Sequence, residues 1–303
     1  MKQRRVVPGL IFVQVLFATL PIAAKLALRE FSAPALTLLR CLAAAVLFFA
    51  IQRLTIRERI VTRGDYAHLA LYSVLGVSLN QLLYILGLTM TTATAAQMLI
   101  AGGPAVTLLV AIVAGKEMPT PAKWLGIGLA GAGALVLVGV GAGGGGMLGN
   151  ILIIINMIAY STYLVAARGI LRKYHPLTVI TWIFIFGVLG LLPFGLLPAV
   201  HEFATTSLQA RLALLWIILF PTVTAYYLNM WALTVVESSL VSTFVYLQPP
   251  MTALLAMPIL GERPSVRMIP AAVLIFAGVA VAIWSGRRAD HRPHPEEQAV
   301  IEP

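Results

Sequence analysis

Ten long runs of apolar residues, almost free of charged side chains, constrain this chain more than any other feature. A helix needs about 20 apolar residues to cross a bilayer, and the runs have about that length. Inside a bilayer only helices and closed barrels satisfy every backbone N–H and C=O group. Barrel strands alternate apolar and polar residues, and these runs do not, so helices are predicted. The predicted spans cover residues 8–28, 34–52, 66–88, 93–114, 122–140, 149–167, 177–199, 212–235, 239–260 and 267–285.

The composition agrees with a membrane protein and leaves no room for a large soluble domain. Of the 303 residues, 60% are hydrophobic and 11% are charged, and the mean hydropathy is +0.93. Soluble domains have about 25% charged residues. The net charge of +10 would suggest nucleic acid in a soluble protein, but here the basic residues cluster between apolar runs and act as topology signals. A lipid bilayer is therefore the expected partner, and nucleic acid is not.

The basic residues also predict the orientation of the chain. If the N-terminus is cytoplasmic, 15 of the 21 Lys and Arg fall in inside segments and 5 in outside segments, while Arg40 lies within a predicted helix. Basic segments stay in the cytoplasm, so both termini are predicted to be cytoplasmic. The basic start MKQRR resembles a signal peptide. An uncleaved first helix is preferred, because a comparable segment recurs at 149–168.

Two segments that lie 145 residues apart have similar sequences. PAVTLLVAIVAGKE (104–117) and PPMTALLAMPILGE (249–262) share a proline, a threonine and a terminal glutamate at matching positions. This offset divides the ten spans into two halves of five. Because five is odd, the two copies must enter the membrane from opposite sides. The predicted fold is therefore all-α and polytopic, with ten transmembrane helices arranged as two inverted five-helix repeats.

The predicted organisation follows from these halves. A cytoplasmic N-terminus (1–7) precedes the first repeat (8–140), a glycine-rich linker (141–148) joins it to the second repeat (149–285), and a polar tail (286–303) is predicted to be disordered. Inverted repeats with a pseudo-two-fold axis in the membrane plane are typical of secondary transporters. Exchanging the conformations of the two halves would open a central site to opposite faces, which is alternating access.

Polar side chains within the predicted spans are the candidates for binding a solute, since such groups are costly in lipid and face the bundle interior. The alternative is that they only form hydrogen bonds between helices. The predicted substrate-binding residues, chosen mainly because they share helical faces or recur in both halves, are Gln14, Asn80, Gln81, Tyr84, Gln97, Asn156, Tyr160, Tyr163, Tyr226, Asn229, Ser242 and Tyr246. They predict a central cavity that holds a small amphipathic solute.

Arg40, two prolines and two glutamates complete the candidates. Arg40 lies about six residues into the second span, where it could bind a substrate carboxylate, pair with a nearby carbonyl, or extend to the outer face. Pro104 and Pro249 permit kinks and are predicted to be hinges or static bends. Glu117 and Glu262 end their helices, where a carboxylate is unfavourable against the dipole. They are predicted to be structural or gate residues paired with Lys116 or Lys123 and with Arg263 or Arg267, respectively.

The segment NQLLYILGLTMTTATAAQMLIAGGPAVTLLVAIVAGKE (80–117) resembles the EamA-like branch of the drug/metabolite transporter superfamily. YYLNMWALTVVESSLVSTFVYLQPPMTALLAMPILGE (226–262) repeats its pattern, and the resemblance covers about 9–285. It implies transport of small metabolites, often amino-acid export, across the bacterial inner membrane. The substrate itself does not carry over, because members differ widely.

Other functions have less support in the sequence. No paired-acid, HExxH or Ser/His pattern lies within a span, so no enzyme and no metal or other cofactor is expected, and the single Cys41 forms no intramolecular disulfide. No Asp or Glu lies mid-span, so the coupling ion is not indicated. A non-transporting membrane scaffold or lipid-binding protein is the alternative. Gly126, Ala130 and Ala134 form a small-residue stripe that suits packing within one chain or in a homodimer.

Overall fold

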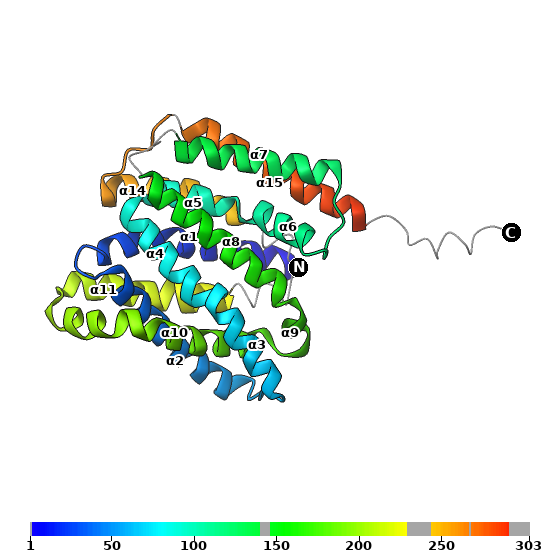
Figure 1. Cartoon of the computed structure of the whole chain (residues 1–303). Helices are drawn as coiled ribbons and strands as arrows, with labels where there is room; N and C mark the ends of the chain where they lie inside the picture. The colour runs from blue at the N-terminus through cyan, green and yellow to red at the C-terminus, as the bar shows by residue number, and fades with distance from the viewer. Residues whose placement is uncertain (1, 140–145, 229–243, 267, 291–303) are drawn as a thin grey trace.

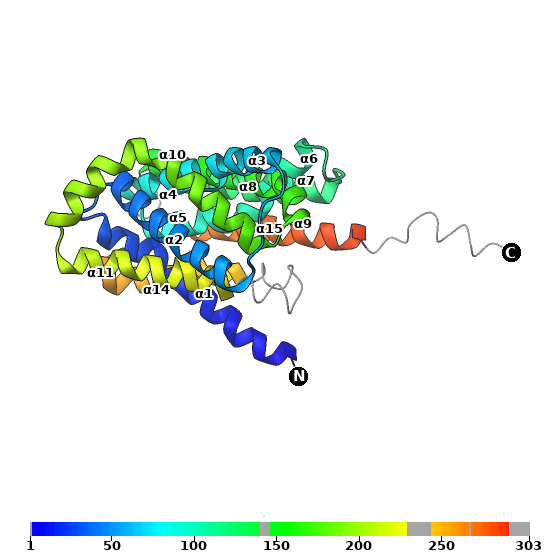
Figure 2. The ribbon, with the colours of Figure 1, turned by 90° about the horizontal axis from the view of Figure 1, so that it is seen from below.

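The structure, a computed structural model, describes residues 2–139, 146–228, 244–266 and 268–290. In these ranges the chain is helical and contains no β-strand, and the helices pack side by side in one bundle (Figure 1, Figure 2). The elements are α1 Lys2–Ala27, α2 Ala33–Thr55, α3 Arg63–Ser73, η1 Val74–Ser78, α4 Leu79–Met90, α5 Ala93–Ala101, α6 Gly103–Val113, α7 Pro121–Gly139, α8 Met147–Ala166, α9 Arg168–Lys173, α10 Pro176–Thr205, α11 Leu208–Ile217, η2 Ile218–Thr224, η3 Val245–Leu247, α14 Gln248–Leu260 and α15 Met268–Asp290.

The prediction of an all-α membrane protein is confirmed in the described ranges. Seven helices are long and apolar enough to cross a membrane, and the count becomes eight if α5 and α6, which meet at a bend of 42°, form one span. Shorter apolar helices, Val245–Leu260 and Met268–Ala282, occupy the two remaining predicted runs. Ten crossings therefore remain a prediction. Helix α15 continues to Asp290, five residues into the tail that was predicted to be disordered, and the first proline beyond it is Pro293.

Two ends of the bundle can be distinguished. The N-terminal end of α1, the C-terminal end of α15, the α6–α7 connection and α9 lie at one end (Figure 1, Figure 2). The α1–α2 connection, the turn between α10 and α11 and the C-terminal end of α14 lie at the opposite end (Figure 1). We call these the terminal end and the far end. The grouping matches the segments that the charge distribution assigned to the inside and the outside.

Carboxylates at the far end stabilise the beginnings of helices. Glu202 accepts a hydrogen bond from the backbone N–H of Ser32, the N-cap residue of α2, at 2.8 Å. Glu30 accepts from the backbone N–H of Ser207, the N-cap residue of α11, at 2.6 Å. Hydrogen bonds from the Ser207 side chain and backbone hold the pKa of Glu30 below its usual value. A negative charge at a helix N-terminus is favourable, so these acids are structural.

Helices α7 and α15 pack with their backbones almost in contact. A Cβ atom added to Gly126 would lie 2.7 Å from the backbone oxygen of Gly278, and one added to Gly278 would clash with the backbone of Ala130. Gly133 meets the backbone of Ala271 at 2.8 Å in the same way. The small-residue stripe on α7 is therefore filled by α15 of the same chain. The stripe therefore gives no support to a homodimer, and the homodimer stays a prediction.

Two π-helical segments occupy related positions in the sequence. Shifting Val74–Ser78 (η1) by 145 residues gives 219–223, which falls within Ile218–Thr224 (η2). Each contains a distinctive local feature. In η1 the ring of Tyr163 lies 2.8 Å from the place where Gly76 would carry a Cβ atom, and in η2 Pro221 lacks a backbone N–H. Because π-helical turns are uncommon, their recurrence at one offset agrees with the predicted internal repeat, which stays a prediction.

Substituting Gly126 with Ala should destabilise the protein, because the new methyl group would force α7 away from α15. Overpacking of this kind costs about 1–3 kcal/mol. Gly128 is the matched control, since among the described residues nothing lies within 4 Å of its added Cβ atom. Thermal unfolding of the purified protein in detergent would compare the two. We expect Gly126→Ala to lower the melting temperature and Gly128→Ala to leave it unchanged or raise it; equal effects would contradict this packing.

Candidate functional site

A cavity of about 760 Å³ lies in the centre of the bundle. Its lining comes from α1, α2, α4, α5, α6, α8, the start of α9, Tyr226 beyond η2, η3, α14, α15 and the α6–α7 connection. The polar lining residues are Arg40, Asn80, Gln81, Tyr84, Gln97, Thr107, Glu117, Asn156, Tyr160, Ser161, Arg168, Tyr226 and Gln248. Apolar side chains, among them Phe17, Leu20 and Ile100, form much of the remaining wall. The cavity suits a small solute with both polar and apolar parts.

Eight of the thirteen predicted substrate-binding residues line this cavity. They are Arg40, Asn80, Gln81, Tyr84, Gln97, Asn156, Tyr160 and Tyr226. Gln14, Tyr163 and Tyr246 lie elsewhere: Gln14 is fully buried, Tyr163 packs against Gly76, and Tyr246 forms an edge-to-face contact with Phe276. Asn229 and Ser242 lie outside the described residues. Whether the lining residues bind a solute stays a prediction.

Asn80 and Asn156 join α4 to α8 by reciprocal hydrogen bonds. The Asn156 side-chain amide donates to the Asn80 backbone oxygen at 2.6 Å, and the Asn80 side-chain amide donates to the Asn156 backbone oxygen at 3.2 Å. Gln81 donates to the Asn80 side-chain oxygen at 3.0 Å. These amides fix the spacing of two helices and so shape one wall of the cavity.

Three glutamines connect α5, α14 and α1. Gln97 Nε2 donates to Gln248 Oε1, and Gln248 Nε2 donates to Gln14 Oε1, both at 2.6 Å. Gln248 was missed by the sequence analysis, which favoured polar residues that recur in both halves. Its counterpart at the 145-residue offset is Gly103, which has no polar side chain. Its position one residue before Pro249, inside an apolar run, was the available signal.

Arg40 is buried inside the bundle, with 3% of its surface exposed. Its Nε donates to the hydroxyl of Thr222 in η2 at 3.0 Å. Among the described residues, no acceptor lies within hydrogen-bonding distance of its Nη1 atom. The expectation that this side chain could extend to the outer face is therefore wrong. The reason is that α10 and η2 pack against α2 and enclose it.

Thr107, Ser161 and the charged residues Glu117 and Arg168 line the cavity toward the terminal end. Thr107 on α6 donates to Ser161 on α8 at 2.9 Å. Glu117 pairs with Lys123 at 3.2 Å and with Arg168 at 3.8 Å. Lys123 was one of its predicted partners, whereas Arg168 was missed because it lies in a different half of the chain. The lining thus continues from Arg40 to the α6–α7 connection.

Toward the far end, α14 is held against α1 and α5. Thr252 on α14 donates to the backbone oxygen of Ala18 on α1 at 3.0 Å. Glu262 accepts from the backbone N–H groups of Ala93 and Thr94, at 2.7 and 3.2 Å, and from the Thr94 hydroxyl at 2.9 Å. These contacts hold α14 against α1 and α5 on the far-end side of the bundle.

The observed partners of Glu262 are therefore not the predicted Arg263. Its carboxylate lies at the N-terminus of α5, where the helix dipole stabilises a negative charge, although the residue follows the C-terminus of α14. In the described part of the chain its carboxylate accepts hydrogen bonds from Ala93 and Thr94 of α5 and forms no ion pair with the exposed Arg263. Arg267 lies outside the described residues. Sequence reasoning could not find α5 as the partner, because the two segments lie 169 residues apart.

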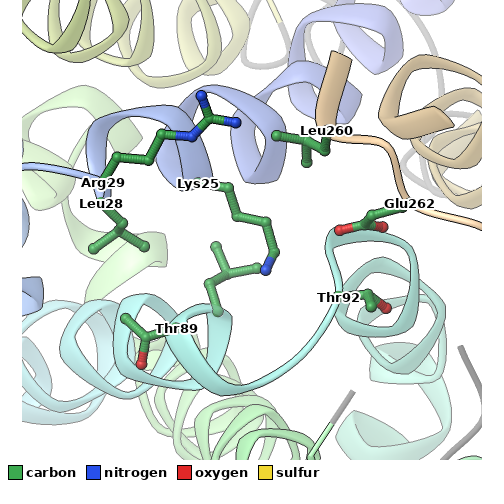
Figure 3. Close-up of a pocket in the computed structure, with 8 residues that line it drawn as sticks. Lys25, Leu28, Arg29, Thr89, Thr92, Leu260 and Glu262 are labelled. Carbon is green, nitrogen blue, oxygen red and sulfur yellow. The ribbon is translucent and has the colours of Figure 1, made fainter. Parts of the chain in front are cut away.

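A second, smaller cavity of about 370 Å³ lies beside Glu262. Figure 3 shows Lys25 and Arg29 of the α1 region on one side, and Glu262 above the first turn of α5 on the other. Lys25 interacts electrostatically with Glu262. This cavity lies at the far end and is separate from the central one.

The two prolines stand where helices break. Pro104 is in the first turn of α6, directly after the 42° bend that separates α6 from α5. Pro249 is in the first turn of α14, directly after the short 3₁₀ segment η3. Only Pro104 lines the central cavity. A proline in the first helical turn costs no hydrogen bond, so both positions suit a break in the span. Their action as hinges stays a prediction.

Comparisons with known proteins agree with this architecture. A model of the EamA-like transporter family matches residues 6–139 and again residues 147–284. The chain belongs to the EamA-like transporter family. It is therefore a multi-pass membrane transporter and not an enzyme, as predicted. The predicted resemblance is confirmed.

Individual relatives share less than 30% of their residues with this chain over the aligned segments. An uncharacterized transporter of Archaeoglobus fulgidus is 28% identical over 218 residues, which cover 71% of this chain and 75% of the relative. The uncharacterized transporter YdfC of Bacillus subtilis is 26% identical over 237 residues, covering 78% and 76%. A crystal structure described only as that of a protein has a TM-score of 0.59 and 19% identity, and the match covers 94% of this chain and 99% of that one. It supports the fold alone.

Removing the Glu262 carboxylate should destabilise the contact between α14 and α5. We expect Glu262→Ala to cost about 1–2 kcal/mol, because two backbone N–H groups lose a charged acceptor. Arg263→Ala is the control, since Arg263 was a predicted partner but is exposed. Thermal unfolding of both purified variants would decide between the two accounts. An equal loss for Arg263→Ala would show that the ion pair, and not the α5 N-terminus, holds Glu262.

Proposed function

We propose that this chain is a secondary transporter that moves small metabolites, such as amino acids or related amphipathic solutes, outward across the bacterial inner membrane by alternating access. The observation that carries the proposal is the central cavity, lined at membrane depth by amides, hydroxyls and aromatic rings from both halves of the chain. Polar groups are costly within a bilayer unless they serve packing or a pathway. Export and the solute class rest on the family resemblance.

The proposal includes ten spans in two inverted repeats, with both termini in the cytoplasm. Three observations support it. The family model matches the chain twice, over stretches close to the predicted repeats 8–140 and 149–285. The two π-helical segments recur at the repeat offset. Both described chain ends lie at the same end of the bundle, as an even number of crossings requires (Figure 1).

The packing of the helices supplies a fourth argument. Helix α8 packs on α4 and α6, and α1 packs on α11 and α14. A shift of 145 residues takes α1 to α8 and α6 to α14, so the contact of α8 with α6 and the contact of α1 with α14 are equivalent. The pairs α2 with α10 and α7 with α15 are each formed by corresponding helices. Such packing is expected for two similar halves related by a pseudo-two-fold axis.

In this arrangement the described conformation is open toward the cytoplasm. The cavity lining reaches Glu117 and Arg168 at the terminal end, whereas α14 closes on α1 and α5 toward the far end. The opposite state would require α14 to leave α5, which exposes the Glu262 contact. Glu262 would thus act as an outer gate, and Pro104 and Pro249 would accommodate the change in helix angle.

Counterflow in liposomes tests the transport function. Purified protein would be reconstituted into vesicles loaded with an unlabelled solute, and uptake of the labelled solute would be followed over a panel of amino acids and amphipathic metabolites. We expect saturable uptake of at least one solute. Leu164→Trp, which places a larger side chain in the cavity wall, should abolish it. Leu135→Trp is the control, because Leu135 is 72% exposed on the outside of the bundle.

Two outcomes would contradict this function. Absence of flux for every solute would favour a scaffold or lipid-binding protein. Flux that survives in Leu164→Trp as well as in Leu135→Trp would show that solutes do not pass through the central cavity.

A further inference from the structure

The buried guanidinium of Arg40 has no counter-ion in the described part of the chain. The ion pairs found there involve Lys123 and Arg168 with Glu117, and Lys173 with Asp65. Arg40 has one neutral acceptor, the Thr222 hydroxyl, and its Nη1 atom has none among the described residues. A guanidinium carries five N–H donors and stays charged at any physiological pH.

Burying a guanidinium costs free energy unless an opposite charge or further hydrogen-bond acceptors lie next to it. A buried charge normally needs an opposite charge or full hydrogen bonding, and this holds more strictly within a membrane. Only 3% of the surface of Arg40 is exposed, and the residue lines the central cavity. A group that enters the cavity can therefore reach the guanidinium, whereas bulk water on the outside of the bundle cannot.

The surroundings of Arg40 favour an anion. Tyr84 and Tyr226 line the same cavity as Arg40. Their hydroxyls can donate hydrogen bonds to an oxygen bound at the guanidinium. Among the described lining residues, the one carboxylate is Glu117, which is already paired with Lys123 and Arg168. Among the described residues, the positive charge of Arg40 deep in the cavity is thus uncompensated.

We propose that the transported solute is an amphipathic carboxylate, and that Arg40 binds its carboxylate group. A guanidinium matches a carboxylate in charge and in planar geometry. The apolar part of the solute would lie against Phe17, Leu20 and Ile100. A positively charged amino group gains no attraction from the Arg40 guanidinium. We therefore expect a carboxylate without an amino group to bind more tightly than the corresponding amine and than the zwitterionic amino acid. This inference rests on the proposed function and narrows its solute class.

A matched solute series tests the preference in the unmodified protein. The probes are 3-phenylpropanoate, 3-phenylpropanamide, 3-phenylpropylamine and phenylalanine, with the corresponding set built on hexanoate for a smaller apolar part. Binding would be measured by isothermal calorimetry on protein in lipid nanodiscs. We expect a carboxylate to bind about 10- to 100-fold more tightly than its amide, as one charge-assisted contact provides. If no carboxylate binds more tightly than its amide and its amine, the proposal is wrong.

Variants then assign the preference to one residue. Arg40→Gln should reduce the carboxylate preference to less than about threefold, and Arg40→Lys should keep part of it because the charge remains. Arg53→Gln is the control: it removes the same charge from the same helix, but Arg53 is exposed and lies over the Phe49 ring. A full carboxylate preference in folded Arg40→Gln would overturn the assignment. If Arg40→Gln does not fold, the Arg40→Lys variant and the wild-type series still decide.

The result can be separated from that of the proposed function. Carboxylate-selective binding without counterflow would refute transport while leaving the anion site in place. Counterflow of solutes without any preference for a carboxylate would support transport and refute the role of Arg40. Competition of the carboxylate by chloride at equal concentration would show that Arg40 holds an inorganic anion, which would also contradict the proposal.

Discussion

Hydrocarbon offers no hydrogen-bond partner, and the arrangement of polar groups in this chain follows from that constraint. Backbone groups pair within helices, and polar side chains lie between helices or around one cavity. Asn80 and Asn156 satisfy each other's backbone, and three glutamines form a chain across α5, α14 and α1. Three buried groups have no hydrogen-bond partner among the described residues, namely Gln14 Nε2, Arg40 Nη1 and the Tyr246 hydroxyl, and of these three only the Arg40 guanidinium is charged and lines the cavity. In an apolar bundle, such a charged group indicates where a solute binds.

The need to satisfy backbone N–H groups also explains how the helices are held together at the far end of the bundle. Glu202, Glu30 and Glu262 each accept hydrogen bonds from the backbone at the beginning of a helix that is distant in sequence. A carboxylate at a helix N-terminus balances the positive end of the dipole, so these acids hold the far end together through hydrogen bonds to the backbone. Glu117, at the terminal end, pairs instead with Lys123 and Arg168. The two ends of the bundle are thus held by contacts of different kinds, which suits a carrier that opens one end at a time.

The all-helical fold could be predicted from the sequence, because the apolar runs are local signals. The family resemblance also followed from the sequence alone, whereas ten crossings in two inverted repeats stay a prediction. The site was only partly predictable. Tyr84, Gln97 and Asn156 line the cavity as expected, whereas Gln248 was missed because its repeat partner is a glycine. The burial of Arg40 and the partner of Glu262 depend on segments 182 and 169 residues away, which no local pattern reveals.

The central claim is that two halves of opposite orientation enclose one transport site, and the sidedness of two repeat-related positions tests it most directly. Met118 is 80% exposed, and Arg263, 145 residues later, is also exposed. Each would be replaced by cysteine in a Cys41→Ala background and labelled in intact cells with a membrane-impermeant thiol reagent. The account predicts labelling of Arg263→Cys from outside, and labelling of Met118→Cys only after the membrane is opened. Labelling of both positions from the same side would contradict it.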